Sequence, residues 1–241
     1  CPYGAYFSSN AATLPAANNT GNLSIRPNSI ATEILYNDQT QKAEGVRIID
    51  SETNEVMEFK AKIIFLCASA LASTQLLLLS KSGRYPNGLG NDSGVLGTHI
   101  LFHNYRAGMG AEIDGYDDHY YRVRRPSECI IPNFRNVRQR DADFLGGYVI
   151  FAGASRETIN DDGLQPRVGA AFKEALRRPG KWTSYMYMQG ETLPKASNRV
   201  WLSPDRRDAW GVPLLVTSVG YDDNDERMIE DFVREGRAMF E

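Results

Sequence analysis

At 241 residues, with 42% hydrophobic and 24% charged side chains, the chain has the composition of a globular protein with a real core. Its 27 basic and 30 acidic side chains leave a net charge of −3, so electrostatics give no reason to expect nucleic acid or an anionic membrane as a partner. No apolar run approaches the roughly 20 residues that a membrane-spanning helix needs.

The cysteines do not indicate a metal site or a disulfide framework. Cys1, Cys67 and Cys129 are widely spaced and odd in number, and no CxxC motif is present. We expect reduced thiols, although Cys1 could pair with a cysteine in an upstream segment. The chain opens Cys-Pro-Tyr-Gly without a methionine and shows no signal peptide, so we expect the natural N-terminus to lie elsewhere.

The first 60 residues predict a three-stranded β-meander. After a polar start rich in turn formers, Leu23–Arg26 and 29–36 alternate at a period of two residues, as in a half-buried strand. Residues 45–50 and 56–60 read as two further strands, each preceded by a polar, turn-forming segment.

A buried strand, a tight turn and a helix are predicted next. Ile63 to Leu66 is apolar without alternation, which indicates a strand buried on both faces, as in a parallel sheet. Small residues follow, and 73–79 reads as a helix. This layout brings backbone close to a cofactor, but many α/β proteins contain such a unit.

The composition changes near residue 100, which is the best candidate for a domain boundary. We therefore expect a first domain over 1–100, a second over 101–222, and a terminal helix over 223–241. The fold class is mixed α/β, or α+β, in which the meander and the strand–helix unit are joined to an antiparallel sheet with flanking helices. The predicted strands of the second half are 128–134, 147–154, 182–190, 199–202 and 214–219, and its other helix is 164–178.

Several strings resemble the glucose–methanol–choline (GMC) family of flavin oxidoreductases in their order and spacing. They are Asn22–Ile34, Ala43–Val46, Ile64–Ser80, Val95–His103, Asn198–Pro204, Asp208–Pro213 and Tyr221–Asn224. The chain departs from the family pattern at Ser69, Thr74 and Ala31, where Gly, Pro and Val are usual. The subtype is similar to the flavoprotein subunits of bacterial sugar-acid and sugar-alcohol dehydrogenases, so cytoplasm and periplasm both remain open as compartments.

The resemblance covers nearly the whole chain but only the middle of the family's length. It implies an internal fragment of an FAD-dependent enzyme that oxidises CH–OH groups of a sugar, polyol or sugar acid by hydride transfer to the flavin. The GxGxxG turn and the segment with the catalytic His are missing, so we expect the fragment to be inactive and to retain FAD poorly. The alternative is a stand-alone carbohydrate-binding or interaction domain without redox chemistry.

The resemblance also implies cofactor contacts at five residues. Ile30 or Ala31 would present backbone to the adenine, and Cys67, Ala68 and Ser69 would face the ribose and pyrophosphate. The competing interpretation is that these small residues only allow the helix to pack on the preceding strand.

Aromatic residues of the second half are candidates for contact with a sugar. The strongest are Tyr148, Tyr185 and Tyr187, because alternation along 148–151 and 185–188 would turn one face toward a substrate cavity and the other toward a covering helix. Core packing explains aromatic residues equally well. The wider set of candidates comprises Tyr116, Tyr120, Tyr121, Phe151 and Trp210.

No catalytic residue or metal ligand is predicted. None of the three histidines, His99, His103 and His119, sits where the family keeps its base, and the pair four residues apart lacks a third ligand. The basic strings 122–125 and 135–140 are typical of solvated surface. An electron-transfer subunit or an acidic sugar is the lesser alternative as their partner.

Overall fold

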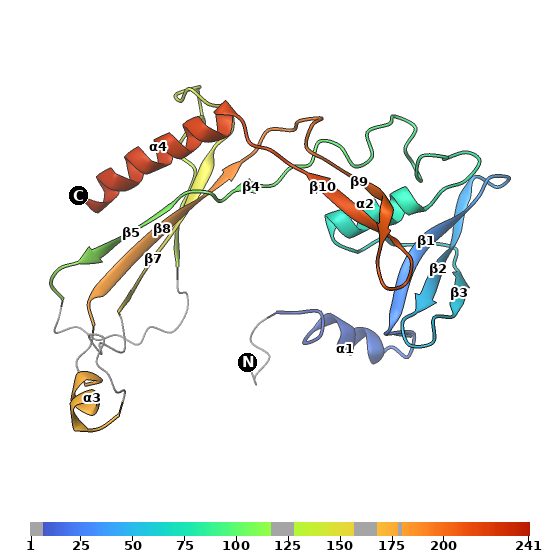
Figure 1. Cartoon of the computed structure of the whole chain (residues 1–241), viewed down its shortest axis with the longest axis horizontal. Helices are drawn as coiled ribbons and strands as arrows, with labels where there is room; N and C mark the ends of the chain where they lie inside the picture. The colour runs from blue at the N-terminus through green and yellow to red at the C-terminus, as the bar shows by residue number, and fades with distance from the viewer. Residues whose placement is uncertain (1–6, 117–127, 157–167, 178–179) are drawn as a thin grey trace. The chain divides into compact units, whose positions relative to one another are not determined.

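The computed structural model describes residues 7–116, 128–156, 168–177 and 180–241. The chain divides into two compact units, one of Cys1–Gly97 with Val200–Val216 and one of Thr98–Arg199 with Thr217–Glu241 (Figure 1). Antiparallel sheets and helices occur in both, which confirms the mixed α/β class. In the described part of the chain, no helix combines the length and the apolar character needed to cross a membrane.

The first unit contains the predicted meander. Strands β1 (Ser29–Asn37), β2 (Lys42–Asp50) and β3 (Val56–Lys60) pair antiparallel in the order β1-β2-β3. Leu23–Arg26 is not a strand, because Pro27 and the left-handed Asn28 (φ 55°) separate it from β1.

The expected strand over 63–66 is wrong in this structure. Ile63 and Phe65 are 71% and 82% exposed, and the segment belongs to no sheet. A strand with two apolar faces needs a partner strand along each edge, and none of the described strands pairs with this one.

The helix after this segment is present. Helix α2 spans Ala70–Leu79 and begins earlier than the apolar pattern predicts, because Ser69 caps it. At its C-terminal end the buried Ser80 hydroxyl accepts a hydrogen bond from the Ile34 backbone N–H at 2.8 Å, which ties α2 to β1. A short helix, α1 (Thr13–Asn18), precedes the meander.

A two-stranded ribbon completes the first unit. Strands β9 (Arg199–Arg207) and β10 (Pro213–Ser218) pair with each other, and Gln75 of α2 donates a hydrogen bond to the Pro213 carbonyl at 2.8 Å. Residues 200–216 therefore cluster with the first unit, although they lie within the segment 101–222 that the sequence assigns to a second domain. A Cβ on Gly97 (φ 83°) would lie 2.5 Å from the Val200 carbonyl oxygen, so only glycine fits there.

The second unit is built on an antiparallel sheet in the order β4-β8-β7-β6, with β5 also paired to β8. Its strands are β4 (His103–Asn104), β5 (Gly108–Ile113), β6 (Cys129–Ile131), β7 (Tyr148–Arg156) and β8 (Trp182–Glu191). The sequence does not predict β5, because its glycines read as a turn and its hydrogen bonds come from the distant β8. Helix α3 (Ala170–Ala175) falls within the predicted 164–178, part of which lies outside the described residues.

Helix α4 (Asp223–Phe240) lies along one face of this sheet (Figure 1). It begins in a capping box in which Asp222 and Asp225 satisfy each other's backbone N–H groups, so the cap is Asp222 and not the Asp223 or Asn224 that the sequence offers as candidates. Met228 and Phe232 of α4 are fully buried against Ile150 and Met188 of the sheet, and these side chains form the core of the unit.

A polar network fastens α4 to the sheet inside this core. The Tyr148 hydroxyl, with the residue only 2% exposed, donates to the Asp231 carboxylate at 2.7 Å. Arg135 reaches the same carboxylate through two hydrogen bonds, at 2.8 and 3.1 Å, and it also bonds Glu235 at 2.6 Å. Arg135 is therefore a structural cation rather than part of a solvated basic string, because the buried Asp231 needs a charged partner.

We expect Tyr148→Phe to lower the free energy of unfolding by about 1.5–3 kcal/mol, because it removes a hydrogen bond to a buried carboxylate. Burial raises the pKa of Tyr148 to about 12 from 10.0, so its stabilising contribution is full below pH 10 and is lost as the pH rises toward 12. Urea denaturation at neutral pH and again above pH 10 measures both effects. Tyr105→Phe, at an exposed tyrosine, is the control, and equal effects of the two substitutions would contradict the role of the network.

The glycine contact gives a second stability prediction. Gly97 and Gly90 have similar backbone angles (φ 83° and 76°), but a Cβ at Gly90 would meet nothing within 4 Å. Gly97→Ala should therefore destabilise the protein by about 2 kcal/mol more than Gly90→Ala, because only the former forces a side chain against a backbone carbonyl. Thermal unfolding of both variants measures the difference, and equal midpoints would show that the Gly97–Val200 contact carries no constraint.

Candidate functional site

The turn before α2 carries three of the five predicted cofactor contacts. Cys67, Ala68 and Ser69 are consecutive and exposed, and they stand at the N-terminal end of the helix. The Ser69 hydroxyl accepts a hydrogen bond from the Ala72 N–H at 3.3 Å, and the Ser73 hydroxyl donates to the Ala68 carbonyl at 3.2 Å. The first amides of a helix have no partner within the helix and attract negative charge. This turn therefore presents small side chains and helix amides to whatever approaches it.

The other two predicted contacts lie in the meander. Ile30 is half-buried and Ala31 is exposed, and they pair with Ile49 and Ile48 of β2. The register shifts between Ala31 and Glu33, so a β-bulge follows Ala31 directly. The hydrogen bond that joins β1 to α2 is made by Ser80, at the end of the helix opposite to Ser69. This hydrogen bond therefore joins β1 to the end of α2 away from the turn.

The free cysteines include one member of this turn. Cys67 and Cys129 are both exposed, and neither is bonded to another cysteine. Cys67 lies in the first unit and Cys129 begins β6 in the second unit.

Strand pairing separates the three predicted substrate residues onto two faces of the second sheet. Directly paired residues of antiparallel strands share a face. Tyr148 pairs with Gly190 and faces α4, whereas Phe151 pairs with Tyr187 on the opposite face, together with Tyr185 two residues away. Tyr148 belongs to the core, where its ring contacts Phe134 and Phe232 and its hydroxyl bonds Asp231, so it does not line a cavity with the other two.

The face opposite α4 carries a group of aromatic rings that we call the aromatic cluster, formed by Tyr105, Phe151, Tyr185 and Tyr187. The Phe151 and Tyr187 rings stack with centroids 5.3 Å apart and an interplanar angle of 9°. The Tyr185 ring is parallel to that of Tyr187 at 6.5 Å, and Tyr105 is tilted toward Tyr187 at 6.3 Å. Tyr105 is 52% exposed, and the other three rings are half-buried.

One carboxylate belongs to the cluster. Glu128, immediately before β6, accepts a hydrogen bond from the Tyr185 hydroxyl at 3.1 Å. Desolvation among the neighbouring rings, followed by this hydrogen bond, raises the pKa of Tyr185 above its ordinary value. Desolvation and the nearby Glu128 charge likewise raise the pKa of Tyr187. Both phenols therefore stay protonated at neutral pH and remain hydrogen-bond donors.

Sequence patterns missed two members of this site. Tyr105 follows a strand of only two residues, and Glu128 is an isolated acid with no motif around it. The alternation that places Phe151 and Tyr187 on the same face becomes readable only once their cross-strand register is known.

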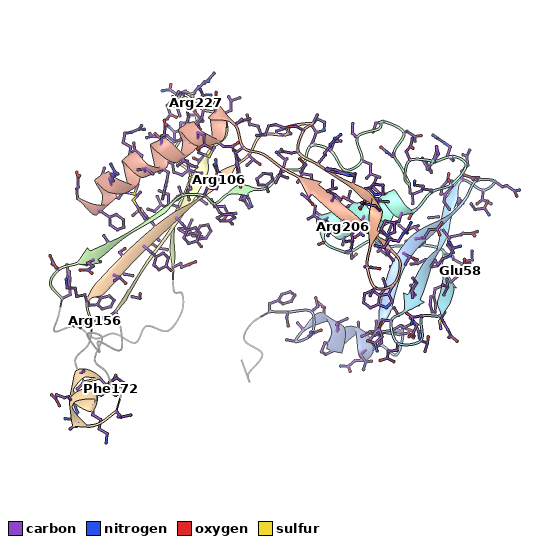
Figure 2. All side chains as sticks on the ribbon, in the orientation of Figure 1. Glu58, Arg106, Arg156, Phe172, Arg206 and Arg227 are labelled. Carbon is purple, nitrogen blue, oxygen red and sulfur yellow. The ribbon has the colours of Figure 1, made fainter. Side chains whose placement is uncertain are left out.

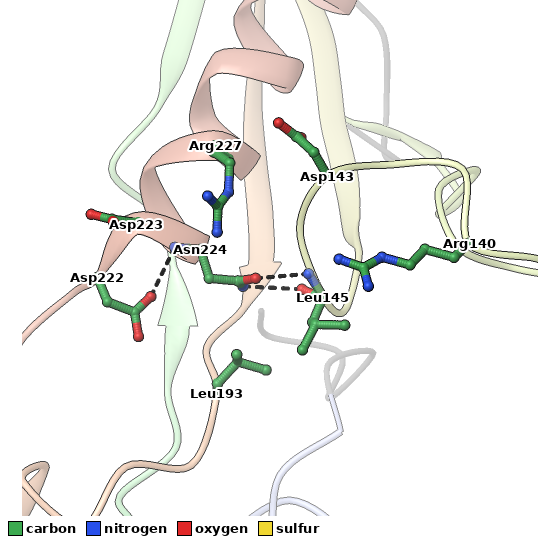
Figure 3. A pocket seen from close by; sticks show the side chains of 8 residues that line it. All are labelled: Arg140, Asp143, Leu145, Leu193, Asp222, Asp223, Asn224 and Arg227. Atoms are coloured by element: carbon green, nitrogen blue, oxygen red, sulfur yellow. Dashed lines mark hydrogen bonds between the residues drawn. The ribbon is translucent and has the colours of Figure 1, made fainter.

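Three of the surface pockets are lined by described residues of the second unit. The first, of about 450 Å³, opens at the N-terminal end of α4, where Asn224 exchanges two hydrogen bonds with the Leu145 backbone (Figure 3). Its lining mixes signs of charge: Arg140, Arg227, Asp143, Asp222 and Asp223. The second, of about 530 Å³, lies between β5 and the C-terminal end of α4, and the third, of about 400 Å³, is lined by His103 and Glu191.

The described histidines do not form a metal site. His99 is exposed in a left-handed conformation (φ 56°), and the His103 ring packs edge-on against Tyr105 at 5.6 Å. Across residues 7–116, 128–156, 168–177 and 180–241, no three His, Cys, Asp or Glu side chains gather as metal ligands would. Nearby, Arg106 (labelled in Figure 2) pairs with Glu226 and stacks over the Tyr221 ring.

Several predicted candidates fall elsewhere. Trp210 belongs to the first unit, and Tyr116 is 66% exposed. Cys1, His119, Tyr120, Tyr121 and the basic string 122–125 lie outside the described residues.

Comparison with known proteins gives one family match. Residues 1–104 match the model of the GMC oxidoreductase family. The matched range includes the meander, the turn at Cys67–Ser69 and helix α2.

Three characterised relatives are similar at low identity. A 2-methyl-1,2-propanediol dehydrogenase of Mycolicibacterium austroafricanum is 25% identical over 71% of the chain, and the large subunit of a fructose dehydrogenase of Gluconobacter japonicus is 26% identical over 99%. The flavoprotein of a gluconate 2-dehydrogenase from Pantoea cypripedii is 24% identical over 97%. The alignments cover 32%, 41% and 39% of the lengths of these relatives.

Proposed function

Because residues 1–104 match the GMC oxidoreductase family and its dehydrogenases align with nearly the whole chain, we propose that the chain is the middle part of an FAD-dependent dehydrogenase that oxidises a CH–OH group of a sugar, polyol or sugar acid. The observation that carries this proposal is the collinear similarity of nearly the whole chain to two sugar-type dehydrogenases. The first unit would be the remainder of an FAD-binding domain, and the second would be the substrate-binding domain.

The exposed apolar segment 63–66 supports the proposal that a longer polypeptide completes the first unit. Exposure of Ile63 and Phe65 forgoes a burial free energy of about 1.5–3 kcal/mol for each side chain. Strands from another part of the polypeptide would satisfy the backbone hydrogen bonds of this segment, and the layers packed on the completed sheet would bury its two faces.

The turn at Cys67–Ser69 fits one wall of a nucleotide site. Its side chains are small and exposed, and the start of the capped helix α2 would bind the negative charge of a pyrophosphate. The chain lacks a GxGxxG turn, so these residues would position FAD together with a phosphate-binding turn supplied by another segment. Bound FAD supplies the hydride acceptor. Ile30 and Ala31, beside their β-bulge, would present backbone to the adenine.

The aromatic cluster supports a sugar or polyol as the substrate. Tyr185 and Tyr187 present apolar ring surface and protonated hydroxyls, which match the C–H and O–H groups of a sugar. In this role they would orient the substrate. We assign no general base to the described residues, and an electron-transfer subunit is the proposed partner that would reoxidise the enzyme.

A stand-alone carbohydrate-binding domain is the second candidate function. The aromatic cluster favours it, because ring stacking on a sugar requires no flavin. The two candidates differ in whether the reading frame encodes a GxGxxG turn upstream and a His-containing segment downstream.

The test is to express the whole reading frame that contains this chain. We expect the purified protein to show the absorption bands of a flavin and to reduce an artificial electron acceptor when a sugar or polyol is added, because the missing segments supply the phosphate-binding turn and the base. The 241-residue chain by itself should show neither property. Stop codons flanking the chain, or turnover by the chain alone, would contradict the proposal.

Thiol labelling in the same full-length protein tests the cofactor-binding residues separately. Bound FAD should slow the alkylation of Cys67 at least about tenfold relative to the FAD-depleted protein, because a covered thiol reacts only when the cofactor leaves. Cys129, the other exposed thiol of the described chain, is the internal control and should react equally in both states. Equal rates at Cys67 would remove the turn from the cofactor site while leaving the enzymatic assignment intact.

A further inference from the structure

The aromatic cluster is bordered by glycines on both neighbouring strands. Gly110 and Gly153 pair with Tyr185, and Gly108 pairs with Tyr187, all on the face away from α4. Aromatic rings between glycines have no cross-strand side chains beside them, except where Phe151 stacks on Tyr187. The β5 residues that pair directly with Tyr185 and Tyr187 therefore place no side chain over these rings.

Among the described residues, the charged group hydrogen-bonded to these rings is an acid. The Glu128 carboxylate bonds the Tyr185 hydroxyl and also lies close enough to Tyr187 to raise the pKa of that phenol. A cation further along the same face, Lys181, is neutralised by Glu112 at 2.7 Å. Arg156, at the end of β7, donates to the Gly180 carbonyl at 2.7 Å.

We propose that Tyr185, Tyr187 and Glu128 bind a neutral sugar or polyol and select it over a sugar acid of the same carbon skeleton. The proposal rests on the proposed function, because it takes this face of the sheet as the substrate-binding side. It narrows the proposed substrates from sugars, polyols and sugar acids to sugars and polyols. The rings would pack against the C–H groups of the ligand, and the carboxylate would accept its hydroxyl hydrogens in charge-assisted hydrogen bonds.

The selectivity follows from the charge of Glu128. A carboxylate accepts hydrogen bonds but donates none, so it suits the hydroxyl groups of a polyol. A sugar acid would bring a second carboxylate to the same place, and like charges a few ångströms apart repel each other. We therefore expect the acid to bind on the order of tenfold more weakly than the neutral compound.

Sorbitol and gluconate are a suitable pair of probes, because both have six carbons and differ in the charge at one end. The 241-residue chain, carrying ring-labelled tyrosine, is titrated with each compound while the tyrosine NMR signals are followed. The signals are assigned with Tyr105→Phe, Tyr185→Phe and Tyr187→Phe. Sorbitol should shift the Tyr185 and Tyr187 signals, and gluconate should need about a tenfold higher concentration for the same shift.

Glu128→Gln isolates the charge, because it keeps an acceptor oxygen of the same size. Gluconate should then bind about tenfold more tightly than to the wild type, whereas the affinity for sorbitol should change less than about threefold. Glu230→Gln, at an exposed glutamate of α4, removes the same charge elsewhere and should change neither affinity. The substituted glutamates are exposed, so both variants should fold, which the thermal midpoint checks.

The outcomes separate this inference from the proposed function. Equal affinities of the wild type for sorbitol and gluconate, or equal effects of Glu128→Gln and Glu230→Gln, would overturn the selectivity. Tyrosine signals that respond to neither compound would overturn the site itself. A full-length protein without flavin that still preferred sorbitol would refute the redox function and leave the selectivity standing.

Discussion

The two-residue period of the β7–β8 pair decides which side chains of the second unit a ligand can reach. Because helix α4 covers one face, the residues in phase with Ile150 and Met188 that lie under it are buried in the core, whereas Phe151 and Tyr187 lie on the opposite face and are half-buried. The Tyr148–Asp231 bond makes this choice rigid, since a shift of one residue would bury the aromatic cluster and expose the polar network.

The first unit, in contrast, exposes large apolar side chains that a globular protein normally buries. Ile63 and Phe65 lie in water because no described strand pairs with them. The adjacent helix is held by its cap at Ser69 and by the hydrogen bond that the Ile34 N–H of β1 donates to Ser80. The meander and α2 are thus held by contacts within the unit. The apolar segment 63–66 stays unpaired, because a buried strand needs a partner strand along each edge.

Charge is distributed differently in the two regions that carry the proposed sites. The turn at Cys67–Ser69 has no acidic side chain, and it ends at a helix start that favours an anion. In the aromatic cluster, by contrast, the carboxylate of Glu128 is hydrogen-bonded to Tyr185. This carboxylate favours a neutral ligand with many hydroxyl groups. An anionic cofactor and an uncharged substrate are the pair that best suits these two surfaces.

Local pattern determined the meander, the helices α2 and α4 and the family resemblance, because turns, caps and periodicity act between neighbours in the chain. Only the tertiary structure decided that Tyr148 is a core residue while Tyr185 and Tyr187 face outward, because register joins strands more than 30 residues apart. It alone recruited the glycine-rich β5 and joined residues 200–216 to the first unit. The predicted strand at 63–66 failed for the same reason, since an apolar run specifies burial but cannot supply the partner strands that burial requires.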